Sequence, residues 1–399
     1  MNFKELGLHD ALTRQCEQMG YKEPTPIQKQ AIPEALAGND LVACAETGTG
    51  KTAAFLLPIL HKLMTGKRAV GTKILVLAPT RELANQTEVF CRRFASKDIT
   101  CTPLIGGTGY GKQTQALKRN PTIIVATPGR LMDFMQQGMV NFAGLTTLVL
   151  DEADRMLDMG FLPSIKRIVK ALPAKRQTLF FSATMSNEIE RIAYSLLNDP
   201  KFVEVSARGK AAGTIEQVAY PVDAASKTPL LLDLLEKEKF ERVLVFTRTK
   251  RGADRIAHIL EKRDHSSNRI HGDRSQPQRE AALKDFRTGK TRVLVATDVA
   301  ARGIDIESVS HVINYDIPEA PEDYVHRIGR TGRAGSRGRA ITLFTMAEEH
   351  SMKAIEKLTG QTVDRVLLPD FGGRLMAQTT LKTNARPRRF RSFGSRRSR

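Results

Sequence analysis

The chain has 399 residues, of which 41% are hydrophobic and 26% are charged. This is the balance of a soluble globular protein, and the length suits two domains better than one. No apolar run is long enough to cross a bilayer, and the first residues lack the basic and apolar segments of a signal peptide, which argues against a membrane-spanning or secreted protein. The formal net charge of +19 favours a polyanionic partner, although a basic protein can also simply be well solvated.

Cysteine usage indicates a reducing compartment. The four cysteines lack the paired spacing of metal ligands, so we expect free thiols and a cytoplasmic location. They are Cys16, Cys44, Cys91 and Cys101.

In the first half, apolar runs of β-type residues alternate with helical patterns, which predicts a parallel sheet covered by helices. Helices are expected at 51–64 and 81–95. The predicted strands are residues 40–44, 74–78, 123–126, 147–150 and 178–181.

The alternation stops at residues 206–214, which are small and polar, and then restarts. We therefore predict an N-terminal domain at 1–206, a linker at 207–214 and a C-terminal domain at 215–370. In the second domain, the expected strands are 243–246, 292–296, 312–315 and 340–344, and the expected helices are 252–262 and 278–286. Residues 371–399 hold nine Arg or Lys and no Asp or Glu, which predicts a basic disordered tail.

A glycine-rich segment at residues 45–52 follows one predicted strand and opens a predicted helix, the setting of a phosphate-binding loop. Its glycines let the backbone wrap phosphates, and amides at the helix start stabilise negative charge. We expect Lys51 to reach the β- and γ-phosphates and Thr52 to bind Mg²⁺. An ordinary Gly-rich turn would not explain Lys-Thr at the helix start. The candidate nucleotide-binding residues here are Ala45, which stands where the strict pattern has Gly, Thr47, Gly48, Thr49, Gly50, Lys51 and Thr52.

Two neighbouring carboxylates follow the predicted strand at 147–150. Asp151 suits a second Mg²⁺ contact through water, and Glu152 can orient and deprotonate the attacking water. Taken alone, the run Asp-Glu-Ala-Asp would be a common surface turn. Its position at a strand end, about a hundred residues after the loop, favours a site instead.

In their order along the chain, the motifs resemble those of the DEAD-box family of RNA helicases. Residues 20–28 look like the family's Q motif, 151–154 like the motif that names it, and 326–333 like its arginine-rich motif. The match covers about residues 3–370, and the short length and Arg-rich end are similar to the bacterial RhlE-like group. The resemblance implies an α/β fold of two tandem RecA-like domains, each a mostly parallel sheet flanked by helices. It also implies one ATP with Mg²⁺ per chain and RNA as the partner.

The resemblance assigns further residues to the nucleotide. Gln28 would pair with adenine and make ATP the preferred nucleotide, with Tyr21 stacked on the base. Phe3 stands at the family's distance before this motif. Gly303 and Asp305 match the motif that touches the ribose.

Two more groups complete the implied machinery. Arg330 and Arg333 would reach the γ-phosphate as arginine fingers. The residues expected to couple hydrolysis to domain movement are Asp154, Ser182, Thr184 and His326, with the hydroxyls of Ser182 and Thr184 bonded to Asp154.

The RNA contacts implied by the resemblance come from both halves. Several lie at strand-to-helix turns, where amides, hydroxyls and arginines can hold phosphates, although such turns are structural in most proteins. They are Pro79, Thr80, Arg81, Gly106, Gly107, Thr127, Pro128, Gly129 and Arg130 in the first half, and Arg248, Thr249, His271, Gly272, Gln276, Arg279, Thr297, Asp298 and Arg302 in the second.

Three other functions use part of this pattern. A DNA translocase would share the phosphate chemistry, but the Q motif and Asp-Glu-Ala-Asp favour RNA. A non-enzymatic ATP-gated RNA clamp would not need Lys51, Glu152, Arg330 and Arg333. A small-molecule P-loop kinase would leave the second half unused. We therefore predict an RNA-stimulated ATPase that locally unwinds short RNA duplexes or remodels RNA–protein complexes, largely independently of sequence, with the tail adding affinity for phosphates.

Overall fold

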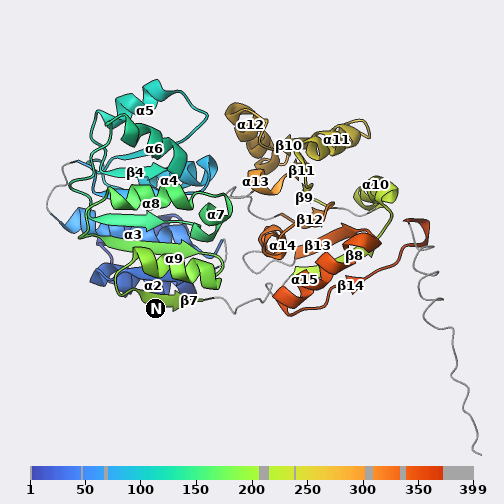
Figure 1. Ribbon diagram of the computed structural model, residues 1–399, viewed down its shortest axis with the longest axis horizontal. Helices are drawn as coiled ribbons and strands as arrows, with labels where there is room; N and C mark the ends of the chain where they lie inside the picture. The colour runs from blue at the N-terminus through green and yellow to red at the C-terminus, as the bar shows by residue number, and fades with distance from the viewer. Residues whose placement is uncertain are drawn as a thin grey trace, which may run out of the picture.

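The computed structural model of the protein describes residues 2–45, 48–66, 71–205, 215–237, 240–301, 309–332 and 338–371. Two α/β domains lie side by side, the first drawn in blue to green and the second in yellow to red (Figure 1). Some predicted segments and site residues lie outside the described residues. They are the linker 207–214, the tail beyond Phe371, and Thr47, Arg302, Gly303, Asp305 and Arg333.

The first domain is built on a seven-stranded sheet in the order β3-β4-β2-β5-β6-β1-β7, in which every neighbouring pair is parallel. Its five central strands are buried along nearly their whole length, as expected of a sheet covered on both faces. The strands are β1 (Leu41–Cys44), β2 (Ile74–Leu77), β3 (Cys101–Leu104), β4 (Ile123–Ala126), β5 (Thr147–Leu150), β6 (Gln177–Ser182) and β7 (Lys201–Glu204).

Helices cover both faces of this sheet because alternate strand residues point to opposite sides. Leu41 and Ala43 of β1 pack with α1–α4, whereas Val42 packs with α5–α9. The helices are α1 (Asp10–Gln18), α2 (Pro26–Ala37), α3 (Lys51–Thr65), α4 (Arg81–Phe94), α5 (Tyr110–Leu117), α6 (Pro128–Gln136), α7 (Ala153–Asp158), α8 (Leu162–Lys170) and α9 (Asn187–Leu196).

The second domain repeats the first. Its seven parallel strands run in the order β10-β11-β9-β12-β13-β8-β14, which is the order of the first sheet shifted by seven strand numbers. The strands are β8 (Ile215–Pro221), β9 (Val243–Phe246), β10 (Ser267–Ile270), β11 (Val293–Ala296), β12 (His311–Asn314), β13 (Gly338–Phe344) and β14 (Asp364–Arg365).

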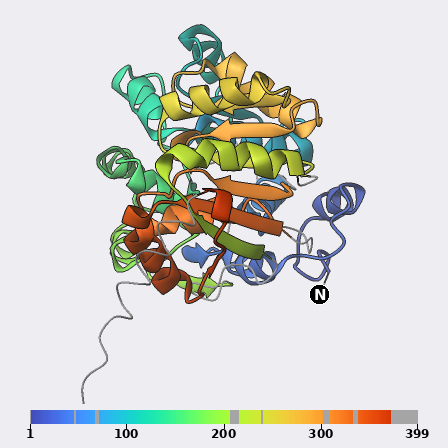
Figure 2. The ribbon, with the colours of Figure 1, turned by 90° about the vertical axis from the view of Figure 1, so that its right-hand side faces the viewer.

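This sheet is also covered on both faces. In Figure 2 the second domain faces the viewer, with α10 in yellow-green and α11 in yellow in front of the strands. Helices α12–α15 pack on the opposite face. The helices are α10 (Lys227–Lys237), α11 (Lys250–Glu261), α12 (Gln276–Arg287), α13 (Asp298–Ala301), α14 (Pro321–Ile328) and α15 (Glu349–Thr359), with short 3₁₀ turns η1 (Ala224–Ser226), η2 (Met346–Glu348) and η3 (Pro369–Phe371).

The predicted fold class of two tandem, mostly parallel α/β domains is confirmed. The proposed domain boundaries stay a prediction. The last strand of the first domain, β7, ends at Glu204, the first strand of the second, β8, begins at Ile215, and residues 206–214 between them are not among the described residues. All four cysteines are free thiols, as predicted. Within the described ranges, no helix combines the length and the apolar character that crossing a membrane requires.

Candidate active site

The loop between β1 and α3 has the backbone of a phosphate-binding loop in its described part. Gly48 and Gly50 have φ of +84° and +90°, a region that glycine enters without the steric cost of a side chain. Lys51 opens α3 and is 6% exposed. Its Nζ has no hydrogen-bond partner among the described residues, which is a costly state for a buried ammonium. An anionic ligand would satisfy it.

Gln28 connects the start of α2 to this loop. Its Nε2 donates to the Gly50 carbonyl over 3.1 Å, and its Oε1 accepts from the Thr25 amide over 2.9 Å. Each end of the carboxamide keeps one further donor or acceptor site, so adenine recognition remains possible alongside both bonds.

The two aromatic residues assigned to the nucleotide differ in position. Tyr21 is partly buried, and its ring stacks on Phe94 with centroids 6.3 Å apart. Phe3 is only 4% exposed and lies in the hydrophobic core under α1–α4. Phe3 thus packs in the core, and its contact with the nucleotide stays a prediction.

Asp151 directly follows β5 and is 2% exposed. Burial, together with the nearby charge of Glu152, raises the pKa of Asp151 to about 7, although the charge of Lys51 acts in the opposite direction. The carboxylate thus lies where additional positive charge would stabilise its ionised form. A cation beside Asp151 would supply that charge.

Glu152 has an unusual backbone and a paired side chain. Its φ of +49° and ψ of +54° are left-handed, a conformation that costs a non-glycine residue roughly 1–2 kcal/mol. The carboxylate lies 2.6 Å from Arg155 Nη1. Burial alone would raise the pKa of Glu152, but the charges of Arg155, Lys51 and Arg330 outweigh it and lower the pKa to about 2. Glu152 is therefore ionised and fixed in orientation.

Asp154 ties α7 to the segment after β6. Its Oδ2 accepts hydrogen bonds from the amides of Ala183 and Thr184, over 3.0 and 2.9 Å, and from Thr184 Oγ1 over 3.0 Å. Ser182 was expected to bond Asp154 as well, but its hydroxyl donates to the Thr184 carbonyl over 2.7 Å. The serine shapes the turn, and the threonine makes the contact.

Two residues of the second domain face this site. The charges of Glu152 and Asp154 act on His326, whose pKa is nevertheless lowered because burial disfavours the charged ring. The positive charge of Arg330, which is 5% exposed, contributes to the low pKa of Glu152. The structure therefore brings Arg330 and His326 to the carboxylates of the first domain.

A direct contact between the domains joins α4 to α12. Arg279 Nη2 lies 2.9 Å from Glu82 Oε1, and Gln276 Nε2 donates to the same oxygen over 3.4 Å. Glu82 and Gln276 are 6% and 5% exposed. In the structure, the side chains of Gln276 and Arg279 contact the first domain, and their predicted contacts with RNA stay a prediction.

Arg81 forms the centre of a cationic cluster near this contact. Burial lowers the pKa of its guanidinium, and the positive charges of Arg279 and Arg130 lower it further, whereas Glu82 acts in the opposite direction. Several cations held together in this way favour an anion between them. Gly107 has a φ of +70°, and a Cβ at this position would overlap Arg81 Nη1. The glycine pair at 106–107 thus leaves space for the guanidinium.

We predict that Gly107→Ala weakens RNA binding about tenfold and flattens the log–log salt slope by about 0.7, the effect of losing one phosphate contact on a single strand. The new methyl group would displace the Arg81 guanidinium. Titration of fluorescent single-stranded RNA at several salt concentrations measures both quantities. Gly111→Ala in α5 is the matched control, since nothing lies within 4 Å of its added Cβ. Equal RNA affinity for Gly107→Ala and Gly111→Ala would contradict the role of Arg81.

The other predicted RNA contacts of the first domain gather at helix starts. Thr80 is the N-cap of α4 and accepts from the Leu83 amide over 3.3 Å, directly after Pro79. Thr127 is the N-cap of α6, followed by Pro128 at its first position. Gly129 follows with open space around its Cα, and Arg130 donates to the Thr108 carbonyl over 3.2 Å. Their RNA contacts stay a prediction.

The second domain places its predicted RNA-contact residues at similar positions after its strands. Thr249 is the N-cap of α11, at the place that Thr80 has before α4. His271 is 2% exposed and bonds Asp254 over 3.1 Å, whereas Gly272 is exposed; their RNA contacts stay a prediction. Asp298 is held by Arg327 through two bonds of 2.6 and 2.7 Å, and its contact with RNA stays a prediction. Thr297, just before it, is buried.

The comparisons with known proteins agree with this geometry. Residues 25–192 match the family described as DEAD/DEAH box helicase, and residues 226–335 match the helicase conserved C-terminal domain. The chain is 44% identical over 380 residues to the DEAD-box ATP-dependent RNA helicase CshA of Bacillus cereus, covering 95% of this chain and 72% of that protein. The chain belongs to the DEAD-box helicase family. The narrower likeness to the RhlE-like group stays a prediction.

Solved structures of DEAD-box proteins also inform the placement of the two domains. The S. cerevisiae protein Dbp5 bound to RNA and ADP BeF3 is 31% identical and superposes with a TM-score of 0.84 over 96% of this chain and 99% of that one. A DEAD box protein from the hyperthermophile Methanococcus jannaschii is 37% identical but reaches only 0.54, over 92% and 99%. The more similar sequence therefore superposes less well over nearly the same share of this chain. This DEAD-box helicase has its domains placed as in liganded Dbp5.

Sequence reasoning missed three residues of this DEAD-box site. Arg155 holds Glu152, Glu82 joins the domains, and Arg327 fixes Asp298. Each is a charged residue inside a quoted or neighbouring motif, and each is at most 6% exposed. The pair of Arg155 and Glu152 has the i,i+3 spacing of a helix and could have been predicted, whereas the partners of Glu82 and Arg327 lie on other elements.

Proposed function

We propose that this ATP-dependent RNA helicase hydrolyses one ATP in the cleft between its domains and uses domain closure to separate short RNA duplexes or remodel RNA–protein complexes. The proposal is supported mainly by the approach of second-domain Arg330 to Glu152. Nearby, the ammonium of Lys51 makes no hydrogen bond within the described part of the chain. Nucleotide bound there would touch both domains. Closure would then depend on the γ-phosphate, because only a ligand that binds the closed state more tightly can shift the equilibrium.

Lys51, Thr52 and Asp151 would hold ATP with Mg²⁺. The donor set fits this ion, which keeps several waters and needs only one or two protein oxygens beside the phosphates. The raised pKa of buried Asp151 supports a cation at this position. Bound Mg²⁺ would neutralise charge on the β- and γ-phosphates.

Glu152 is proposed to orient the attacking water. A carboxylate with a pKa near 2 is a weak base, so before ATP binds Glu152 mainly provides an ionised hydrogen-bond acceptor in a fixed orientation. When ATP binds, the guanidinium of Arg330, together with that of Arg333, which lies outside the described residues, would pair with the γ-phosphate. The positive charge of Arg330 would then stabilise the ionised form of Glu152 less. The basicity of Glu152 would then rise when the substrate is in place.

The RNA-facing part of the proposal rests on the cationic cluster of Arg81, Arg130 and Arg279. Helix starts at Thr80, Thr127 and Thr249 add amides and hydroxyls of the kind that hold phosphates. With no Trp and only 6% aromatic residues, the chain is better suited to backbone contacts than to base stacking. We place the enzyme in the cytoplasm, where free thiols persist.

The most direct test is ATPase activity with no nucleic acid, with a panel of single-stranded and short duplex RNAs, and with DNAs of the same sequences. We expect stimulation by RNAs of unrelated sequence and little by DNA. An ATPase that responds equally to DNA would support a DNA translocase instead. RNA binding without any RNA-stimulated turnover would support a passive clamp.

Replacement of Gln28 by Ala should weaken ATP binding and narrow the difference between ATP and GTP. The carboxamide is the only side chain assigned to the adenine edge, and its loss also removes a bond to the Gly50 carbonyl. Competition binding of both nucleotides to wild type and variant measures the change. Gln115→Ala, on α5 away from the loop, is a control. Equal affinity of the wild type for ATP and GTP would refute the assignment.

A further inference from the structure

The second domain begins a helix with Lys-Thr at the same topological position as the phosphate-binding loop of the first. The two strand orders correspond one to one, so β8 stands where β1 stands. Helix α3 follows β1 and begins at Lys51, and helix α10 follows β8 and begins at Lys227. Both lysines are followed by threonine. Lys227 is thus the counterpart of Lys51.

The connection before Lys227 cannot wrap a phosphate. Residues 222–226 contain no glycine and include the 3₁₀ turn η1, whereas Gly48 and Gly50 give the first loop its left-handed residues. The side chain of Lys227 is nevertheless buried, with 5% of the residue exposed. A buried ammonium needs compensation by another group.

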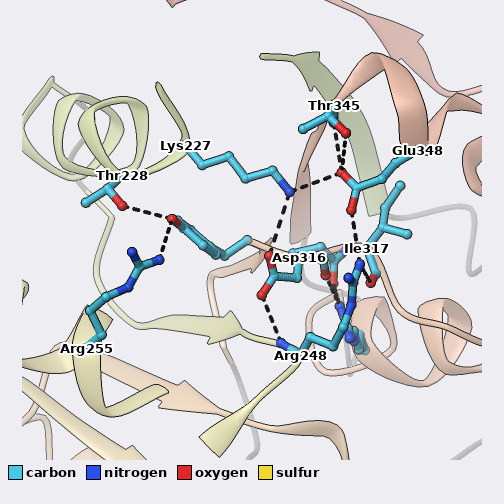
Figure 3. Close-up of polar contacts among 11 residues, drawn as sticks. Lys227, Thr228, Arg248, Arg255, Asp316, Ile317, Thr345 and Glu348 are labelled. Carbon is cyan, nitrogen blue, oxygen red and sulfur yellow. Dashed lines mark hydrogen bonds and ion pairs between the residues drawn. The ribbon is translucent and has the colours of Figure 1, made fainter. Parts of the chain in front are cut away.

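Two carboxylates of the same domain provide it. Lys227 Nζ lies 3.2 Å from Glu348 Oε2 and 3.7 Å from Asp316 Oδ1 (Figure 3). Asp316 is the second residue after β12, as Glu152 is the second residue after the corresponding β5. The carboxylates of Glu348 and Asp316 therefore lie beside Lys227 as the phosphates of a bound nucleotide would lie beside Lys51 in the first domain.

The same carboxylates hold Arg248, which follows β9. Asp316 Oδ2 accepts from the Arg248 amide over 2.9 Å, and Glu348 Oε1 accepts from Arg248 Nη2 over 3.0 Å (Figure 3). Within the described residues, Arg248 Nε and Nη1 have no hydrogen bond, and the side chain is 45% exposed. The bond from Nη2 to Glu348 therefore orients the guanidinium of Arg248, while its Nε and Nη1 can still donate to a ligand.

Glu348 is itself well fixed. Its Oε2 accepts from the Thr345 amide over 2.9 Å and from Thr345 Oγ1 over 3.0 Å. Burial alone would raise its pKa, but the Thr345 amide and Lys227 outweigh burial and lower the pKa. The carboxylate therefore stays ionised at neutral pH and can serve both cations.

We propose that Lys227 is a positioning residue for RNA binding: by neutralising Glu348 and Asp316 it leaves the guanidinium of Arg248 available to an RNA phosphate. Without Lys227, the two carboxylates have Arg248 as their nearest cation, and an uncompensated charge in a partly buried site attracts its counterion strongly. Arg248 then turns inward. The inference rests on the proposed function, because it takes Arg248 as an RNA contact.

The test compares single-stranded RNA affinity of full-length variants in the presence of a non-hydrolysable ATP analogue. Lys227→Met should lower RNA affinity roughly three- to tenfold and flatten the salt slope by about 0.7, the signature of one lost phosphate contact, without changing the KM for ATP. Adding Glu348→Gln to Lys227→Met rebalances the charge and should restore RNA affinity to near the wild-type value.

Lys237→Met is the matched control. Lys237 lies on the same helix, and its replacement by Met removes the same charge. Its side chain, however, is 72% exposed and pairs with Asp233 on the surface. Equal losses of RNA affinity for Lys237→Met and Lys227→Met would reduce the effect to net charge and overturn the proposal. If Lys227→Met unfolds at the assay temperature, the charge-balanced double variant decides alone: RNA affinity well below wild type would overturn the proposal.

Arg248→Ala separates this proposal from the proposed function. If Arg248→Ala leaves RNA affinity unchanged, Arg248 is not an RNA contact and the premise fails. If it weakens RNA binding, Lys227→Met should cause no further loss in the Arg248→Ala background, because coupled residues act non-additively. An equal further loss would place the effect of Lys227 elsewhere. A second bound nucleotide per chain, lost in Lys227→Met, would also overturn the proposal.

Discussion

Glu152→Gln should lower the rate of RNA-stimulated ATP hydrolysis by about 10²- to 10⁴-fold, the usual contribution of a positioned acid–base group. Glutamine keeps the shape of the side chain and an oxygen for Arg155, so the local geometry should survive. ATP and RNA should still bind, because the substitution removes a negative charge from beside Lys51 and Arg330. The variant should therefore accumulate as a complex with both ligands.

Steady-state phosphate release and equilibrium binding of nucleotide and RNA measure these effects separately. Glu188→Gln on α9 is the control, since it neutralises an exposed carboxylate of the same domain. Turnover of Glu152→Gln close to wild type would show that another group orients the water. A parallel loss of ATP affinity would instead point to a role in binding.

Arg330→Ala should also abolish most turnover, by about 10³-fold or more, as expected for an arginine that stabilises the transition state of phosphoryl transfer. The side chain is 5% exposed and reaches the carboxylates of the first domain from the second. RNA binding without nucleotide should change little, since Arg330 is assigned to the γ-phosphate and not to RNA. The main loss should appear in kcat.

Single-turnover hydrolysis at saturating ATP and RNA isolates this step. Arg263→Ala removes the same charge from an exposed position after α11 and should behave as wild type. If Arg330→Ala retained normal single-turnover rates, the second domain would not contribute Arg330 to catalysis. A large loss of RNA affinity without nucleotide would also argue against the assignment.

Central strands of both sheets could be predicted because they are buried on both faces and read as continuous apolar runs, as in Ile74–Leu77 and Val243–Phe246. The strands missed were mostly at sheet edges. Ser267–Ile270 is largely polar, Lys201–Glu204 has polar residues at both ends, and both are only partly buried, so their short patterns resemble those of loops. The strand Ile215–Pro221 pairs with a strand on each side, but it contains Glu and Gln, so its sequence lacks the apolar run that identified the other central strands.

The nucleotide site was more predictable than the RNA site. Asp151 and Glu152 follow β5 and Lys51 opens the helix after β1, and parallel strands place such segments at one edge of a sheet. The contact of Arg279 with Glu82 joins residues far apart in sequence, and the local motif gave no sign that Arg279 serves closure. Ser182 shows the same limit at short range, since both hydroxyls were expected to bond Asp154 and only that of Thr184 does so.

The central claim is that ATP and RNA are coupled through closure of the two domains. RNA affinity measured with and without a non-hydrolysable ATP analogue and Mg²⁺ tests it most directly, because coupling through a shared closed state must appear as a change in binding. We expect the analogue to tighten RNA binding by about 5- to 150-fold, the usual range for coupled sites. Glu82→Gln, which weakens the contact with Arg279, should reduce that factor. The same RNA affinity with and without the analogue would contradict the account.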